Sequence, residues 1–298
     1  MGVTKVPYRI NWETKEICNE HCTFCFATFE LPADFIIPGT ESQEELRKTL
    51  TTEEVKSLVN QASAVGVHEF LFGGGDPFIR KDMSELIKYT AERGLKVLVD
   101  TNALIVSSKM RLLDDIANSI YRLGIPFDGP NAEINDKMRD MPGAFEKAMK
   151  LLSSSQDKPY QIKVNTVVTA QNYHAIPDMV NTFTEYRVNR WSLDQFIPLM
   201  RGSDYRKVYE IQDQLYRDTV AKVKERMYAS GLSIDISGGT EAEKSGTVLL
   251  FSPQGVAYVS RNSEKQYIAS IRNTNLKQIV EASSLDMEKH KLRYGAHV

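Results

Sequence analysis

Strand and helix patterns alternate along most of this chain, from residue 8 to residue 230. One helix is marked by a capping box at Thr51–Glu54, by apolar residues at helical spacing and by a stop at Gly66. Strands joined by helical crossovers run parallel, and both faces of their sheet are covered. The alternation therefore predicts an α/β fold with six strand–helix units. Their sheet is either open and doubly wound or barrel-like.

The predicted elements can be placed by residue range. Strands are expected at 8–12, 68–72, 96–100, 120–125, 161–168 and 190–196, and helices at 51–65, 82–93, 108–117, 143–152, 176–186 and 209–227. The pattern then changes to short strands at 232–236, 247–251, 256–260 and 267–271, with a helix at 276–282. We expect a main domain over residues 1–230 and a small mixed α/β cap over residues 231–298. Active groups gather at the carboxyl ends of such parallel strands.

Composition excludes several classes of protein. The 37 basic and 39 acidic residues nearly cancel, so neither nucleic acid nor an anionic membrane is an expected partner. No run of 18 apolar residues predicts a transmembrane helix, and the first residues lack the apolar core of a signal peptide. The sequence thus predicts a cytoplasmic protein.

All three cysteines of the chain, Cys18, Cys22 and Cys25, lie in the long loop after the first predicted strand. Thiolates at the spacing C-x3-C-x2-C can converge on zinc, copper(I) or an iron–sulfur cluster. A structural zinc site usually has four protein ligands, whereas three cysteines leave one iron of a cubane cluster open. Completion of a zinc site by His21 would require strain, because His21 lies between the thiolates. A disulfide is disfavoured by the odd count.

With Phe24 before its last cysteine and Phe26 after it, this motif resembles that of the radical S-adenosylmethionine (SAM) superfamily. The resemblance implies a partial (β/α)6 TIM-type barrel and a 4Fe–4S cluster bound by Cys18, Cys22 and Cys25. It also implies that the open iron chelates SAM, whose cleavage releases a 5′-deoxyadenosyl radical. Phe24 would lie beside these cofactors, and an external donor such as flavodoxin or ferredoxin would supply the electron.

Later strand ends carry further parts of this resemblance. Gly73–Pro77 is similar to the Gly-Gly-Glu-Pro segment of the family, with Asp in place of Glu, and Asp100–Ala103 is similar to its Thr-Asn-Gly segment. Ile125–Gly129 ends the fourth strand, and Lys163–Val168 resembles the Lys-x-Asn-x-Val-Val strand of the family. A turn aspartate before glycine explains Asp128 equally well. The resemblance implies contacts with SAM from Gly74, Gly75, Asp76, Thr101, Asn102, Asp128 and Asn165.

The sequence also bears on the substrate. With no fourth cysteine in the sequence, a cysteine hydrogen donor is excluded, and auxiliary clusters are not expected. If the protein donates hydrogen, a tyrosine such as Tyr258, Tyr267 or Tyr294 is a candidate, although the default interpretation of each is an ordinary surface or core tyrosine. Cys25–Phe26, the Lys163-x-Asn165 strand and Arg190–Trp191 resemble viperin-like nucleotide dehydratases. The layout of the chain also resembles cytosylglucuronate decarboxylase-like enzymes. These weaker resemblances imply a small polar substrate, such as a nucleoside, nucleotide or sugar.

Two alternatives stay open. One is a single-cluster radical SAM enzyme that modifies peptides, of epimerase or cross-linking type, and the other is a non-catalytic iron–sulfur protein. The loop from residue 27 to residue 50 is expected to act as a lid over the site.

Overall fold

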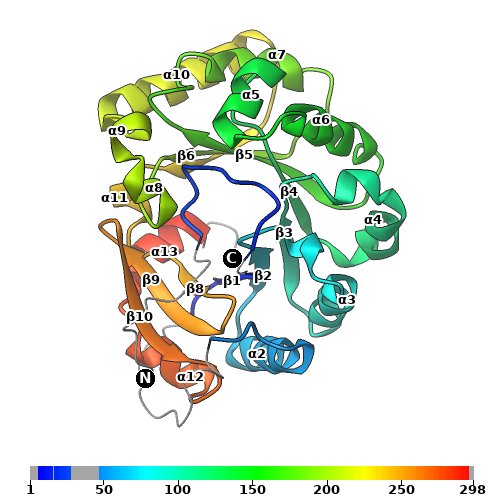
Figure 1. Cartoon of the computed structure of the whole chain (residues 1–298), viewed down its shortest axis with the longest axis vertical. Helices are drawn as coiled ribbons and strands as arrows, with labels where there is room; N and C mark the ends of the chain where they lie inside the picture. The colour runs from blue at the N-terminus through cyan, green and yellow to red at the C-terminus, as the bar shows by residue number, and fades with distance from the viewer. Residues whose placement is uncertain (1–5, 16, 28–46, 295–298) are drawn as a thin grey trace. The chain divides into compact units, whose positions relative to one another are not determined.

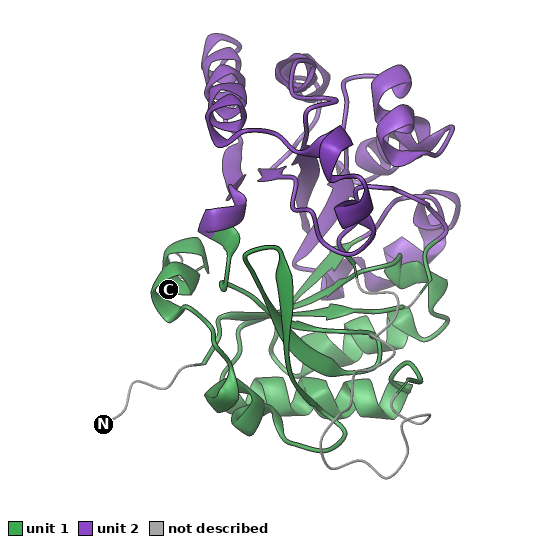
Figure 2. Ribbon diagram, turned by 60° about the vertical axis from the view of Figure 1, so that its left-hand side comes forward, with its two compact units in different colours: residues 1–18, 27–100, 244–298 green, residues 19–26, 101–243 purple. Residues whose placement is uncertain are grey.

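The computed structural model describes residues 6–15, 17–27 and 47–294 of the chain. Helices and strands alternate along the sequence (Figure 1) and form two compact units (Figure 2). Unit 1 combines residues 1–18, 27–100 and 244–298, and unit 2 combines residues 19–26 and 101–243. Most of the expected lid, residues 28–46, lies outside the described residues.

Unit 1 contains a mixed sheet in the order β10-β9-β8-β1-β2-β3. Its strands are β1 (Arg9–Glu13), β2 (Glu69–Gly73), β3 (Lys96–Asp100), β8 (Leu249–Phe251), β9 (Val256–Arg261) and β10 (Glu264–Ser270). Strands β8, β1, β2 and β3 are parallel, and β9 and β10 are antiparallel to their neighbours. The late strands therefore extend the sheet that begins with the first strand.

Unit 1 also contains helices, and the interior beside its sheet is apolar. The helices are α2 (Thr52–Val65), η1 (Pro77–Ile79), α3 (Met83–Glu92), α12 (Leu276–Ala282) and α13 (Met287–Tyr294). Trp12 and Phe72 are fully buried on adjacent strands with ring centroids 6.0 Å apart, and Arg80 lies 5.1 Å from the centre of the Trp12 ring. The predicted capping box of α2 is present, since Thr51 and Glu54 bond each other's backbone.

Two contacts fasten the C-terminal part of unit 1. Arg272 Nε lies 2.5 Å from Glu54 Oε1 on α2, and its Nη2 lies 3.0 Å from Oε2. His290 on α13 accepts the Tyr8 N–H through Nε2 at 2.7 Å, and its Nδ1 lies 2.6 Å from the Thr247 carbonyl oxygen. Burial lowers the pKa of His290, and the charges of Arg9 and Arg293 act in the same direction.

Unit 2 contains an all-parallel sheet in the order β4-β5-β6-β7. Its strands are β4 (Arg122–Pro126), β5 (Gln161–Val168), β6 (Arg190–Gln195) and β7 (Asp235–Gly239). Its helices are η2 (Val106–Ser108), α4 (Met110–Ile116), η3 (Ala117–Ser119), α5 (Ala132–Arg139), α6 (Ala144–Ser154), η4 (Ile176–Asp178), α7 (Met179–Phe183), α8 (Arg201–Asp204), α9 (Arg206–Tyr209) and α10 (Asp213–Ala229). The short α11 (Glu241–Lys244) follows β7.

Strand β5 shows how the two faces of this sheet differ. Its even-numbered residues from Ile162 to Val168 are buried, whereas Lys163, Asn165 and Val167 are only partly covered. On the buried face, Trp191 packs edge-on against Phe183 at 5.0 Å, and its indole N–H donates to Thr166 Oγ1 at 2.9 Å. One face of the sheet is thus sealed by helices and the other keeps polar side chains.

The predicted α/β class with a parallel sheet is confirmed. The strands at 96–100 and 161–168 and the helix at 276–282 match their predicted ranges, whereas α5 and α13 were not predicted. The predicted division at residue 230 stays a prediction: β7 belongs to unit 2, and β8 to β10 belong to unit 1. No described helix is both long and apolar enough to cross a membrane.

The Glu54–Arg272 pair gives a test of stability against pH. The bonds from Arg272 lower the pKa of Glu54 from 4.5 to about 2. The pair therefore stabilises the fold fully above pH 4.5, and this contribution is lost as the pH falls toward 2. We expect Arg272→Ala to lower the free energy of unfolding by about 1 kcal/mol at pH 7, after discounting for solvent screening, and by less at pH 3.

Urea denaturation at the two pH values measures this difference. Arg206→Ala is the control, because Arg206 pairs with Glu210 at 3.3 Å where both side chains are more than half exposed. An equal loss of stability in the Arg272 variant at pH 7 and pH 3 would show that the carboxylate charge of Glu54 contributes nothing.

Candidate cofactor site

The loop after β2 packs tightly against the segment that leads to the first cysteine. Gly74 and Gly75 have φ values of +55° and +63°, in the left-handed region that favours glycine. A Cβ on Gly74 would lie 2.5 Å from Glu13 Cβ, and one on Gly75 would lie 2.7 Å from the Ile17 carbonyl oxygen. Thr14 N–H donates to the Gly73 carbonyl at 2.8 Å. Side chains are thus excluded from this loop by the backbone beside it.

Asp76 completes the same loop and is fully buried. Its Oδ1 accepts the Phe78 N–H at 2.8 Å, so the carboxylate caps the helix η1. This bond fixes the end of the glycine loop. The predicted contact of Asp76 with SAM stays a prediction.

In unit 2, Cys22 and Phe24 lie in a small hydrophobic cluster. Their neighbours there are Met138, Phe196 and Tyr209, and the half-buried Cys25 packs against the cluster. The rings of Phe24 and Tyr209 meet edge-on with centroids 5.9 Å apart. Phe24 therefore anchors the cysteine loop, here defined as residues 19–26, and its predicted place beside the cofactors stays a prediction.

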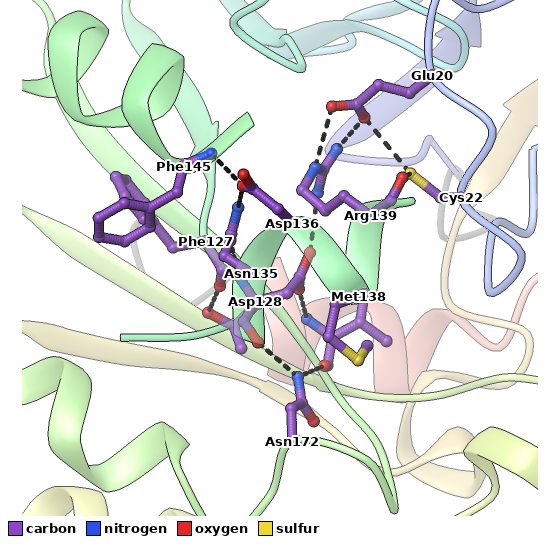
Figure 3. A network of polar contacts seen from close by, with 12 residues as sticks. Glu20, Cys22, Phe127, Asp128, Asn135, Asp136, Met138, Arg139, Phe145 and Asn172 are labelled. Carbon is purple, nitrogen blue, oxygen red and sulfur yellow. Dashed lines mark hydrogen bonds and ion pairs between the residues drawn. The ribbon is translucent and has the colours of Figure 1, made fainter. Parts of the chain in front are cut away.

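A buried network of charged groups lies next to Cys22 (Figure 3). Arg139 at the end of α5 donates through Nε to Glu20 Oε1 at 3.2 Å and through Nη1 to Asp128 Oδ2 at 2.8 Å. Asp128 Oδ1 also accepts the Val167 N–H at 2.8 Å. The Cys22 thiol lies 3.4 Å from both Glu20 Oε2 and the Arg139 carbonyl oxygen.

Burial is the largest influence on the pKa values of Cys22 and Asp128 in this network. It raises the pKa of the Cys22 thiol well above its usual range, although the charge of Arg139 acts in the opposite direction. Burial also raises the pKa of Asp128, again opposed by Arg139. A metal binds the thiolate, so binding at Cys22 requires release of this proton.

Of the other predicted residues, Thr101 and Asn102 directly follow β3, and Asn165 lies within β5. Thr101 N–H donates to the Gly124 carbonyl at 3.2 Å, and Asn102 Nδ2 donates to Asn19 Oδ1 on the cysteine loop at 2.7 Å. Asn165 lies on the partly covered face of β5, in register with Ser192 of β6. Asn102 is thus joined to the cysteine loop, and Asp128 is joined to it through Arg139.

The donor set fits an iron–sulfur cluster in its chemistry. Cys18, Cys22 and Cys25 form no disulfide, and soft sulfur ligands are those that such clusters require. Among the residues that the structure describes, no three His, Cys, Asp or Glu side chains are gathered around a common point. The three thiols are therefore grouped only by their spacing in the sequence.

Two residues of this site were missed from the sequence. Glu20 lies inside the cysteine motif, and Arg139 ends a helix that was not predicted. A charged residue between two cysteines of the motif is one available signal. The Asn131 cap before α5 is another, because its side chain accepts the Ile134 N–H.

Comparison with known proteins gives the family. The sequence model of the Radical SAM superfamily matches residues 12–183. Over 196 residues the chain is 30% identical to an AdoMet-dependent heme synthase of Nitratidesulfovibrio vulgaris, a match that covers 65% of this chain and 49% of the relative. It is 24% identical to an S-adenosylmethionine-dependent nucleotide dehydratase of Lacinutrix mariniflava, over 99% of this chain and 59% of the relative.

Solved structures agree in fold. Streptococcus suis SuiB bound to its precursor peptide SuiA has a TM-score of 0.73 at 16% identity, over 98% of this chain and 67% of that one. The structure of native anSMEcpe with bound AdoMet has a TM-score of 0.68, over 96% of this chain and 83% of that one, also at 16% identity. The chain spans about half the length of the curated relatives it matches. It belongs to the radical SAM superfamily, whose members are enzymes that use a 4Fe–4S cluster and SAM, as its cysteine motif predicted.

Proposed function

We propose that this protein cleaves SAM reductively and abstracts hydrogen from a small polar substrate, such as a nucleoside, nucleotide or sugar. Cys18, Cys22 and Cys25 would hold the cluster through their thiolates. When bound, the cluster and SAM supply the radical chemistry, by release of a 5′-deoxyadenosyl radical. The protein residues bind, orient and shield the reacting molecules.

The glycine loop is suited to the methionine end of SAM. With no Cβ at Gly74 or Gly75, backbone groups reach a bound amino group closely. The loop keeps one conformation because Asp76 caps η1 and Thr14 bonds Gly73. Thr101, Asn102 and Asn165 would present polar groups to the rest of the cofactor.

The observation that most supports a small polar substrate is the partly covered face of the unit 2 sheet. Lys163 and Asn165 of β5 share this face with Arg190 and Asp194 of β6, as the parallel register requires. Charged and amide groups on a partly covered sheet face suit a substrate with hydroxyl or phosphate groups. The match of the nucleotide dehydratase over 99% of this chain points in the same direction.

The second candidate is modification of a peptide. A PqqA peptide cyclase of Bradyrhizobium diazoefficiens is 25% identical over 62% of this chain, and the mycofactocin maturase MftC of Mycolicibacterium smegmatis is 27% identical over 72%. These matches leave more of the chain uncovered than the dehydratase match does. We therefore rank the peptide substrate second.

Reductive cleavage needs one electron from outside the protein. We propose a flavodoxin or ferredoxin as the donor and the cytoplasm as the compartment, since thiols and clusters stay reduced there.

The reaction is tested with protein reconstituted anaerobically with iron and sulfide. We expect reductant and SAM to yield 5′-deoxyadenosine, with a rise when the correct member of a panel of nucleotides, nucleosides and sugar nucleotides is added. Cys22→Ala is expected to abolish both the cluster absorbance and the product, because one of three iron ligands is lost. Chromatography with mass detection measures the product.

Each alternative has its own outcome. A rise in 5′-deoxyadenosine with peptides and none with the small molecules would establish the second candidate. Cluster absorbance without 5′-deoxyadenosine under any condition would leave a non-catalytic iron–sulfur protein, and full absorbance in Cys22→Ala would refute the ligand assignment.

The glycine loop gives a separate test of stability. An alanine at Gly75 would have both a positive φ and a Cβ that meets the Ile17 carbonyl oxygen at 2.7 Å. We expect Gly75→Ala to lower the free energy of unfolding by about 3 kcal/mol, from roughly 1 kcal/mol of backbone strain and about 2 of overpacking.

Gly94→Ala is the matched control, because Gly94 has φ +80° but nothing lies within 4 Å of its Cβ position. It is expected to lose about 1 kcal/mol in the same urea denaturation. Equal losses in the two variants would mean that the glycine loop has room for a side chain.

A further inference from the structure

We propose that Glu20 and Arg139 are positioning residues that hold the cysteine loop in the conformation in which its cysteines bind iron. We propose also that the Glu20 carboxylate places a negative charge next to the Cys22 sulfur. The inference rests on the proposed function, since it takes Cys22 as a ligand of the cluster. It concerns Glu20 and Arg139, which contact the Cys22 thiol.

The contacts form a continuous chain from the sheet to the thiol (Figure 3). Asp128 is held by the Val167 N–H and, through its own N–H, by Asn135 Oδ1, both at 2.8 Å. Arg139 bridges from Asp128 to Glu20, and both Glu20 and the Arg139 carbonyl lie 3.4 Å from Cys22 Sγ. The thiol is thus oriented by groups that strand β5 and helix α5 fix.

The charged side chains of this network are almost fully buried. The side chains of Asp128, Glu20 and Arg139 are 1%, 2% and 10% exposed. Two carboxylates share one guanidinium, so each depends on Arg139 for compensation of its charge. Removal of one partner from such a buried pair leaves the other charged and poorly solvated. Arg139 is therefore required for Glu20 to stay beside Cys22.

Other contacts hold the remainder of the cysteine loop. Thr23 Oγ1 lies 2.7 Å from Tyr209 OH, Gly202 N–H donates to the Cys25 carbonyl at 3.2 Å, and Arg201 donates to the Cys22 carbonyl at 3.4 Å. These contacts fix the backbone. The Glu20 carboxylate, by contrast, contacts the sulfur atom that is to bind iron.

The carboxylate has an electrostatic consequence for a cluster bound at Cys22. An electron added to the cluster increases the negative charge near Glu20, and the two repel each other in a site with little water. Hydrogen bonds and charges around the cysteine sulfurs set the reduction potential of such clusters. Glu20 is therefore expected to lower the potential.

The experiment compares Glu20→Gln, Arg139→Gln and Arg139→Lys with the wild-type chain, all reconstituted with iron and sulfide without SAM. We expect the midpoint potential of Glu20→Gln, from a redox titration followed by electron paramagnetic resonance, to be more positive. The iron affinity of Arg139→Gln, measured by competition with a chelator, should fall about 10-fold. This is the lower end of the usual loss of metal affinity when a residue that contacts a metal ligand is removed. Arg139→Lys should recover part of this loss.

Arg217→Gln is the matched control, because Arg217 pairs with Glu243 with both side chains about half exposed. It should keep both the potential and the iron affinity of the wild type. An unchanged potential in Glu20→Gln together with wild-type iron retention in Arg139→Gln would overturn the inference. If Arg139→Gln does not fold, an unchanged potential in Glu20→Gln and unchanged retention in Arg139→Lys would overturn it equally.

The Cys22→Ala variant distinguishes failure of the proposed function from failure of this inference. Full cluster absorbance in Cys22→Ala would refute the ligand assignment itself, whatever the two positioning residues do. Loss of the cluster in Cys22→Ala, with no effect of the Glu20 and Arg139 variants, would refute only this inference.

Discussion

Arg139 carries a positive charge in a place that water hardly reaches. Its two ion pairs and its backbone carbonyl act on three parts of unit 2: the end of β4, the cysteine loop and the thiol of Cys22. A guanidinium suits this role because its planar fork donates in several directions at once without losing its charge. The conformation of the cysteine loop thus depends on a helix that follows β4, far from the cysteines in sequence.

Much of the fold was predictable because its causes are local. The strand at 161–168 and the capping box of α2 depend on neighbouring residues in the sequence, and both are observed as predicted. Helix α5 was missed because it is short and buries few side chains, among them Asn135 and Arg139, which are polar. A helix that packs through polar contacts leaves no apolar stripe in the sequence.

The candidate site was predictable in part for the same reason. The spacing of the cysteines and the glycines of residues 73–75 are local signals. By contrast, the partners of Asp128 and Phe24 come from segments distant in sequence, and only the folded chain brings them together. Asp128 has an ion-pair partner in Arg139 as well as its place in a turn, and Phe24 packs in a cluster that includes Phe196 and Tyr209. Residue type alone does not reveal such partners.

The order of strands in unit 1 has a consequence for how the chain is made. Strand β1 lies between β2 and β8, and its register pairs Ile10 with both Phe70 and Leu249. On a ribosome, the first strand leaves the exit tunnel long before its second neighbour has been synthesised. Until β8 has been synthesised, the edge of β1 that pairs with it has no partner strand. Pairing between strands so far apart in sequence is slow to form. The cysteines lie a few residues beyond this strand, so the residues that lead into their loop reach their final surroundings only after β8 has been synthesised.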